Sequence, residues 1–243
     1  MNSLEGEIVA FEVKKYDAAQ NVFSADKKLI SVEKFFELKL NGSFYRKIFC
    51  SPNDIEDLTI GILAQADKIF SIEDITRLEI KNSLIEVETA EEIKIRNSEV
   101  AGNFSSEVKF IAKDILNCAD KLLGELSSTH DKTKGVHSGI LFDGREILIF
   151  REDIGRHNVF DKIFGAALRA KIFLGDKALI FSGRCSSEMM IKLCRMNIPI
   201  IVAKSVPTTF SINLAKKFGI TLAGRMTADS FCIYTNPERI VLE

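Results

Sequence analysis

The chain has 243 residues, of which 46% are hydrophobic and 28% charged, which is enough for one large folded domain or two small ones. Its net charge of -1 gives no reason to expect nucleic acid or an anionic membrane as a partner, and no apolar run is long enough to cross a bilayer. The N-terminus lacks the pattern of a signal peptide, so we expect a cytoplasmic protein.

Residues 1–98 are predicted to form a smaller, strand-rich α+β part with one helix. The Asn41-Gly42 pair between two apolar runs is a strong hairpin signal. Apolar residues at near-helical spacing follow Pro52, which predicts a helix over residues 55–63. The predicted strands are 7–13, 35–40, 44–49, 76–80 and 83–88.

Residues 99–134 are predicted to be a helix followed by a linker. Apolar residues at helical spacing predict an amphipathic helix over 107–124, with Cys118 on its apolar face. Residues 124–135 are polar and are predicted to be a loop. The five cysteines are odd in number and include no C-x-x-C pair, so we expect buried reduced thiols and no disulfide framework.

Residues 135–243 are predicted to form an α/β domain. Strands separated by helices of ten to fifteen residues indicate βαβ crossovers and a mostly parallel sheet covered by helices. The predicted strands are 138–141, 146–150, 178–181, 198–203, 221–223 and 231–234, and the predicted helices are 159–170, 187–196 and 208–218.

Four loops that follow strands in this domain carry cations and hydroxyls. If the sheet is mostly parallel, several of these loops meet at one edge, where open α/β sheets bind ligands. Guanidinium groups, hydroxyls and helix N-termini together favour a phosphate or pyrophosphate. The alternative is that each arginine pairs locally with Glu152, Asp153 or Asp161. The cations are Arg151, Arg156, Arg184, Lys204 and Arg225, and the hydroxyls are those of Ser182, Ser186, Ser205 and Thr227.

Residues 151–162 (Arg-Glu-Asp-Ile-Gly-Arg-His-Asn-Val-Phe-Asp-Lys) are unusually charged for the turn between a strand and a helix. His157 lies among carboxylates that would favour its charged form, which suits acid–base chemistry or a phosphate contact. A histidine that only caps a turn is the alternative. Signatures of dinucleotide-binding, P-loop, nucleophile-elbow and zinc-deaminase sites are absent, and no metal site is predicted.

Several blocks in this order resemble the FdhD family. They are residues 51–61 (Ser-Pro-Asn-Asp-Ile-Glu-Asp-Leu-Thr-Ile-Gly), 135–139 (Gly-Val-His-Ser-Gly), 151–162, 182–189 (Ser-Gly-Arg-Cys-Ser-Ser-Glu-Met), 221–224 (Thr-Leu-Ala-Gly) and 234–239 (Tyr-Thr-Asn-Pro-Glu-Arg). The resemblance extends from about residue 33 to 240. Members of this family are accessory factors that pass sulfur from a cysteine desulfurase to the guanylated molybdenum cofactor of formate dehydrogenase.

The resemblance implies a cytidine-deaminase-like larger domain without zinc, a homodimer, and formate dehydrogenase and a cysteine desulfurase as partners. It implies that the anion is the guanine-nucleotide end of molybdenum cofactor guanine dinucleotide, carried as cargo, with GDP able to take its place. Arg156, His157 and Arg184 are expected to support it on electrostatic grounds. The family's cofactor loop corresponds to Arg225, Met226, Thr227, Ala228, Asp229 and Ser230.

Two features depart from the family pattern. The family carries sulfur on a Cys-Gly-x-Cys-Gly loop, but the corresponding residues 97–106 contain no cysteine. Cys118 is the nearest thiol and is the weak candidate for a sulfur carrier. In the cofactor loop, where the family usually has Gly and Arg, Asp229 adds a carboxylate near the expected phosphate.

Three functions follow as hypotheses. The first is a sulfurtransferase that uses an unexpected thiol. The second is a non-catalytic cofactor chaperone or dehydrogenase-binding protein, because the cysteine loop is missing. The third is a zinc-free nucleotide-binding enzyme in which His157 and Asp153 act together as a base.

Overall fold

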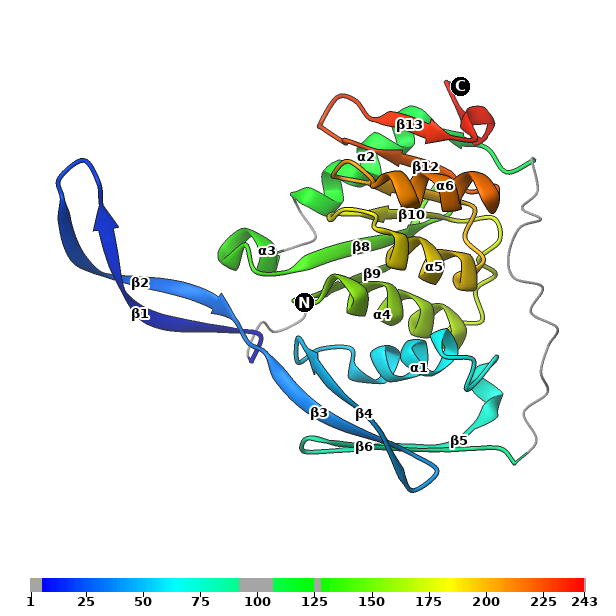
Figure 1. The fold of residues 1–243 in the computed structure, drawn as a ribbon, viewed down its shortest axis with the longest axis horizontal. Helices are drawn as coiled ribbons and strands as arrows, with labels where there is room; N and C mark the ends of the chain where they lie inside the picture. Colours follow the sequence, from blue (N-terminus) through cyan, green and yellow to red (C-terminus); the bar gives the residue numbers. More distant parts are fainter. Residues whose placement is uncertain (1–5, 92–106, 125–127, 243) are drawn as a thin grey trace.

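The computed structural model describes residues 6–91, 107–124 and 128–242. Figure 1 shows two sheets with helices packed between and around them, and a long hairpin that extends away from the body. No helix in these residues is long and apolar enough to cross a membrane. The same residues contain no group of three or more His, Cys, Asp or Glu side chains placed to hold a metal ion.

The larger sheet has six strands in the order β13-β12-β11-β10-β8-β9. Only the β10–β11 and β11–β12 pairs are parallel, and the other three pairs are antiparallel. The prediction of a mostly parallel sheet is therefore wrong. The connections β8–β9 and β12–β13 are too short for a crossover helix, so each must join antiparallel strands. The strands are β8 (His137–Phe142), β9 (Ile147–Asp153), β10 (Ala178–Phe181), β11 (Ile200–Ala203), β12 (Thr221–Gly224) and β13 (Cys232–Thr235).

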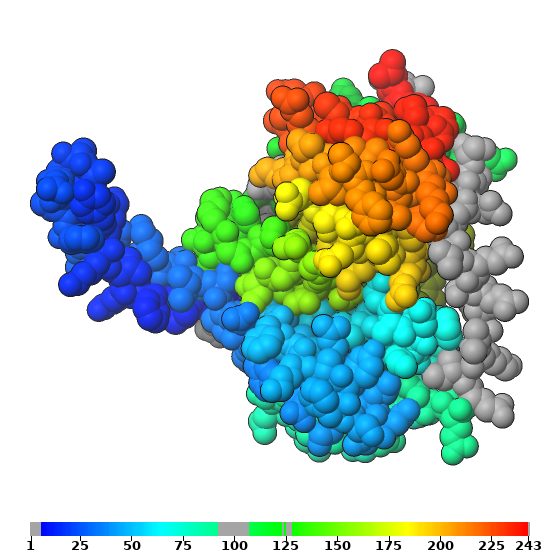
Figure 2. Space-filling model, viewed as in Figure 1, coloured from blue at the N-terminus to red at the C-terminus, as the bar shows by residue number. Residues whose placement is uncertain are grey.

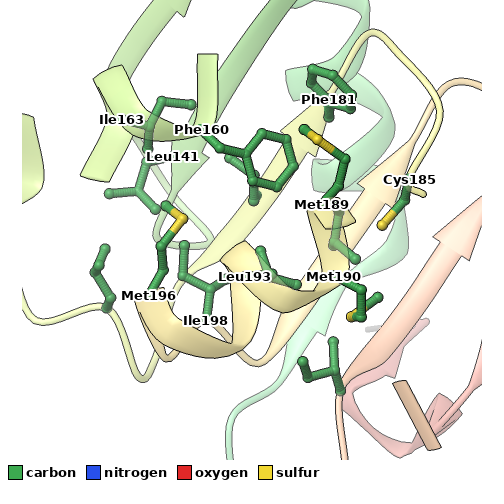
Figure 3. Close-up of a cluster of buried hydrophobic side chains, with 14 of the residues drawn as sticks. Leu141, Phe160, Ile163, Phe181, Cys185, Met189, Met190, Leu193, Met196 and Ile198 are labelled. Carbon is green, nitrogen blue, oxygen red and sulfur yellow. The ribbon is translucent and has the colours of Figure 1, made fainter. Parts of the chain in front are cut away.

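Helices cover both faces of this sheet. Successive residues of a strand point to opposite faces, so each central strand contributes side chains to two cores. Leu179 and Phe181 face the core under α4, α5 and α6, whereas Ala178 and Ile180 face the core under α2. In the first core, α5 contributes Met189 and Met190 beside Cys185 (Figure 3). The helices are α2 (Ala112–Leu123), α4 (Arg156–Arg169), α5 (Ser187–Met196) and α6 (Thr209–Lys217).

The smaller sheet has the order β4-β3-β6-β5, and α1 lies between it and α4 (Figure 1). Two glycines allow α1 and α4 to approach closely. A Cβ on Gly61 would lie 1.8 Å from the backbone oxygen of Asp161, and one on Gly165 would lie 1.9 Å from that of Asp57. The elements are β3 (Lys34–Leu40), β4 (Ser43–Cys50), α1 (Ile55–Gln65), β5 (Ile75–Lys81) and β6 (Leu84–Thr89), with a 3-10 turn at Ile72–Asp74.

The chain begins with a hairpin of β1 (Ile8–Asp17) and β2 (Val22–Ser31), which pair over their full lengths. Figure 2 shows this hairpin standing out from the body. Its base is held by α3 (Ser128–Thr133), where the Ser31 and Thr133 hydroxyls lie 2.8 Å apart. Most of its side chains are exposed, including Phe11 at 57% and Phe23 at 72%.

The described elements confirm most strands and helices predicted from the sequence, with several differences. Strand β2 was not predicted, α3 forms inside the predicted linker, and the helix predicted over 107–124 begins at Ala112. Helix α4 begins at Arg156 instead of residue 159, which places His157 in its first turn. A short pair of strands, β7 (Phe110–Ile111) and β14 (Ile240–Val241), and a 3-10 turn at Pro237–Arg239 complete the fold.

Candidate anion-binding edge of the sheet

The loops predicted to converge do meet at one edge of the larger sheet. Strands β9, β10, β11 and β12 end at this edge, and the antiparallel strands β8 and β13 begin there. Backbone hydrogen bonds join the loops directly. The Ser205 amide donates to the Gly183 carbonyl over 3.4 Å, and the Met226 amide donates to the Lys204 carbonyl over 2.9 Å. The loops still meet although the sheet is mixed, because β9 runs in the same direction as β10 and therefore ends at the same edge.

Four cations at this edge make up the cation cluster: Arg156, Arg184, Lys204 and Arg225. All four are exposed, and in the described part of the chain their side chains make no hydrogen bond or salt bridge. Arg151 differs, because its guanidinium donates two hydrogen bonds to Asp57 Oδ2, from Nε at 2.9 Å and from Nη2 at 2.6 Å. Arg151 is therefore paired, though with Asp57 of α1 and not with one of the three neighbouring carboxylates expected, while the other four cations remain available for an anion.

Three helices also begin at this edge. The positive end of a helix and its unpaired backbone amides attract anions. Helix α6 is capped by the Thr208 hydroxyl, which accepts from the Ser211 amide over 3.2 Å. The N-cap of α5, Ser186, makes no such bond, and its buried hydroxyl has no partner among the described residues. The first-turn amides of α5, which lie next to Arg184, are therefore better placed to bind a ligand than those of α6.

His157 does not have the carboxylate neighbours that the sequence suggested. Its Nε2 lies 3.3 Å from Glu188 Oε2 on α5. Burial lowers the pKa of His157, the nearby Lys192 and Arg156 lower it further, and Glu188 only partly opposes them. The expectation that carboxylates favour its charged form is therefore wrong. Burial and Arg156 also lower the pKa of His137, which begins β8.

Asp153 takes part in a buried network and not in a dyad with His157. Its carboxylate accepts from the amides of Ser51 and Gly155, from the Asn158 side chain and from Lys162 Nζ at 2.8 Å. Lys162 is fully buried and also donates to Asn53 Oδ1 and to the Glu152 carbonyl. The buried network, made of Ser51, Asn53, Asp153, Asn158 and Lys162, joins the end of β4 to β9 and α4. Of residues 151–162, this leaves Arg156 and His157 for ligand contact.

The loop between β12 and β13 is a tight turn. Arg225 adopts a left-handed conformation with φ of 55°, and the Thr227 amide donates to the Ser230 carbonyl over 2.8 Å. Ala228 and Asp229 are exposed at its tip, whereas Met226 is only 4% exposed and packs in the core under α2. The structure therefore places Arg225 among the candidate ligand contacts and Met226 beneath them.

Cys118 lies at the other edge of the sheet. It is 4% exposed, lines a depression beside Phe142 and Ile147, and burial raises its pKa to about 12. Burial likewise raises the pKa of the thiols of Cys50, Cys185 and Cys194 to about 12, 12 and 11. The structure does not bring any of these thiols to the surface at the cation cluster.

Cys232 is the exposed thiol of the five, and the sequence reasoning missed it. It is the first residue of β13 and pairs with Gly224, next to Arg225. Its position directly after the cofactor loop was the available signal. Its exposure follows from the antiparallel return of β13, which the sequence did not show.

Comparison with known proteins decides the family. The model of the FdhD/NarQ family matches residues 92–241. The chain belongs to this family. A sulfur carrier protein FdhD of Staphylococcus haemolyticus is 33% identical over 228 residues, which cover 84% of this chain and 86% of that protein. The FdhD of Staphylococcus aureus strain MRSA252 is 31% identical over 229 residues, with the same coverage.

A solved structure shares the fold of this FdhD-family chain. It is the crystal structure of a candidate formate dehydrogenase accessory protein from Desulfotalea psychrophila, with a TM-score of 0.83 and 22% identity. The match covers 96% of this chain and 99% of that one, so it includes both sheets. The region expected to correspond to the family's sulfur loop, residues 97–106, lies outside the described residues.

Proposed function

We propose that this chain is an accessory protein of formate dehydrogenase that binds the guanylated molybdenum cofactor at the cation cluster and supports its sulfuration. The observation that carries the proposal is that Arg156, Arg184, Lys204 and Arg225 converge on one edge, exposed and without partners in the described residues. Family membership and the names of the relatives support the same function. A cytoplasmic homodimer with a cytidine-deaminase-like larger domain belongs to this proposal.

The cluster would bind the diphosphate of the cofactor by ordinary anion chemistry. Guanidinium groups donate two parallel hydrogen bonds to phosphate oxygens, and Arg184 stands beside the uncapped amides of α5. His157 would add no positive charge to the site, because its lowered pKa leaves it uncharged near neutral pH and its Nε2 faces the Glu188 carboxylate. The exposed Asp229 would disfavour phosphate near the turn, so we place the diphosphate toward Arg184 and Arg156.

Isothermal titration with GDP tests the binding site. We expect Arg184→Gln and Arg225→Gln each to weaken binding about tenfold, as loss of a charge-assisted hydrogen bond predicts. Arg145→Gln is the matched control, because Arg145 is also an exposed arginine but lies in the β8–β9 turn at the other edge. Equal affinity in all three variants would contradict the proposed site.

For the sulfur step, we propose Cys232 as the carrier instead of Cys118. Its thiolate would attack the outer sulfur of the desulfurase persulfide, forming a persulfide on Cys232 and releasing the desulfurase thiolate. The exposure of Cys232 beside Arg225 supports this choice. Intact mass after incubation with a cysteine desulfurase and cysteine should show one added sulfur in the wild type and in Cys118→Ala, and none in Cys232→Ser.

A non-catalytic cofactor chaperone is the second candidate. Two observations favour it, namely the burial of four of the five thiols and the lack of cysteine in residues 97–106. It predicts GDP binding that depends on Arg184, with no sulfur gained on any cysteine. A protein that neither binds GDP nor gains sulfur would contradict both candidates.

A further inference from the structure

An open depression of about 470 Å³ lies where β4, α1, α4 and α5 meet, and we call it the α4–α5 groove. Figure 2 shows α1 (cyan) and α5 (yellow) adjoining on the face turned to the viewer. His157 and Glu188 line the end of the groove nearest the cation cluster, and Lys192 and Arg195 continue along α5 away from it. The groove shares His157 with the proposed nucleotide site, and the sulfur step does not use it.

The lining of the groove carries an excess of positive charge, with three cations, Arg46, Lys192 and Arg195, against two carboxylates, Asp161 and Glu188. Asp161 is buried and forms an ion pair with Lys192, whereas Glu188 lies beside the uncharged His157 and partly offsets the cations. Arg195 lies 3.4 Å from Asp67, an exposed and therefore weak pair.

Arg46 of β4 is the unpaired cation of the groove. It is exposed, and its guanidinium makes no hydrogen bond or salt bridge within the described residues. Five N–H donors on one side of an open groove favour a carboxylate or another anion as the ligand.

A second, independent observation identifies a missing hydrogen-bond donor. Gln65, the last residue of α1, lines the groove and is 7% exposed. Its Nε2 donates to the Lys192 carbonyl over 3.2 Å, which fixes the orientation of the amide. Its Oε1 is buried and has no partner among the described residues. Because a buried unpaired acceptor is costly and uncommon, a donor that enters from the groove as the neighbouring side chains shift would complete the site.

We propose that the α4–α5 groove binds a segment of a partner protein that carries an acidic side chain beside an apolar one. The carboxylate accepts from Arg46, a backbone amide donates to Gln65 Oε1, and the apolar side chain packs on Ile191, which is 46% exposed. A polypeptide offers these three groups within a few residues, whereas a small dicarboxylate lacks the donor. An open, charged groove also suits a peptide better than an enclosed small molecule. The inference goes beyond cofactor binding.

The test uses a fluorescein-labelled, acetylated peptide of alternating Leu and Asp, with an Asn-for-Asp peptide as the matched control. Fluorescence anisotropy at low salt should show saturable binding of the acidic peptide and none of the control. Arg46→Gln should weaken binding about tenfold and reduce its salt dependence. Gln65→Leu should weaken it severalfold with the salt dependence kept, and Arg145→Gln should leave it unchanged.

GDP affinity measured in the same variants separates this site from the cation cluster. We expect Arg46→Gln and Gln65→Leu to bind GDP as the wild type does. The proposal is overturned if the acidic peptide does not bind, if Arg46→Gln binds it normally, or if GDP displaces it competitively. Since Arg46 is an exposed side chain, its variant should fold normally, and its thermal midpoint verifies this.

Discussion

Replacement of Lys162 by methionine tests the buried network directly. Lys162 and Asp153 are both fully buried, and Lys162 also donates hydrogen bonds to Asn53 Oδ1 and to the Glu152 carbonyl. Methionine keeps most of the volume but leaves a buried carboxylate, the part-buried Asn53 Oδ1 and the Glu152 carbonyl without this donor. Removal of one partner from a buried ion pair costs about 3–5 kcal/mol of unfolding free energy. For a chain of this size, that corresponds to a fall in Tm of roughly 6–20 °C.

Urea unfolding monitored by circular dichroism measures this change. A double-mutant cycle with Asp153→Asn isolates the pair, and the double variant should lose less stability than the two single losses added together. Lys171→Met is the control, because Lys171 forms an exposed pair with Glu73 and its removal should leave the unfolding midpoint unchanged. If Lys162→Met lost less than about 1 kcal/mol, the buried network would not hold the two sheets together as argued.

Four further outcomes follow from burial, charge and helix packing. Iodoacetamide at pH 8 should label native protein once, on Cys232, since burial raises the pKa of the other four thiols to about 11 or 12; a mass adduct on Cys232→Ser would contradict this. Arg156→Gln should raise the NMR titration midpoints of His137 and His157, because Arg156 lowers both pKa values. Folding lowers the pKa values of both histidines below 6.5, so the neutral rings contribute to the free energy of unfolding. This contribution is complete above about pH 6.5 and is lost as the pH falls through the folded-state pKa values. Unfolding measured as a function of pH would detect the loss. Gly61→Ala should cost about 1–3 kcal/mol or more by forcing α1 away from α4, and an unchanged unfolding midpoint would show that the close approach relaxes freely.

The elements that were predictable from the sequence are those that local chemistry determines. Asn41-Gly42 marked the β3–β4 hairpin, and apolar runs with helical or alternating periods marked the core elements of the larger sheet. Strand β2 was missed because most of its residues are exposed and polar residues interrupt its apolar pattern. The parallel sheet was overestimated for two reasons. The short β8–β9 and β12–β13 connections, which require antiparallel pairs, were not weighed, and the strand order places β8 between β9 and β10, which no local pattern reveals.

The candidate site was predictable in its cations and not in its pairings. Arg156, Arg184 and Arg225 stood out because each follows a strand, which fixes the edge at which it lies. The partner of His157 could not be predicted, because Glu188 belongs to another helix, α5, which only the fold brings beside α4. The exposure of Cys232 depends in the same way on the return of β13 along β12.

The charged run at residues 151–162 has two roles that the structure separates. Asp153 and Lys162 point inward and fix the end of β9 against the turn after β4. Gly155 donates its amide to Asp153 and is the N-cap of α4, so the helix begins at Arg156, and Arg156 and His157 point outward. Weaker GDP binding in Lys162→Met would therefore report a displaced helix and not a lost contact. For that reason, Arg184 and Arg225, which lie outside the buried network, are the residues whose replacement tests the anion site itself.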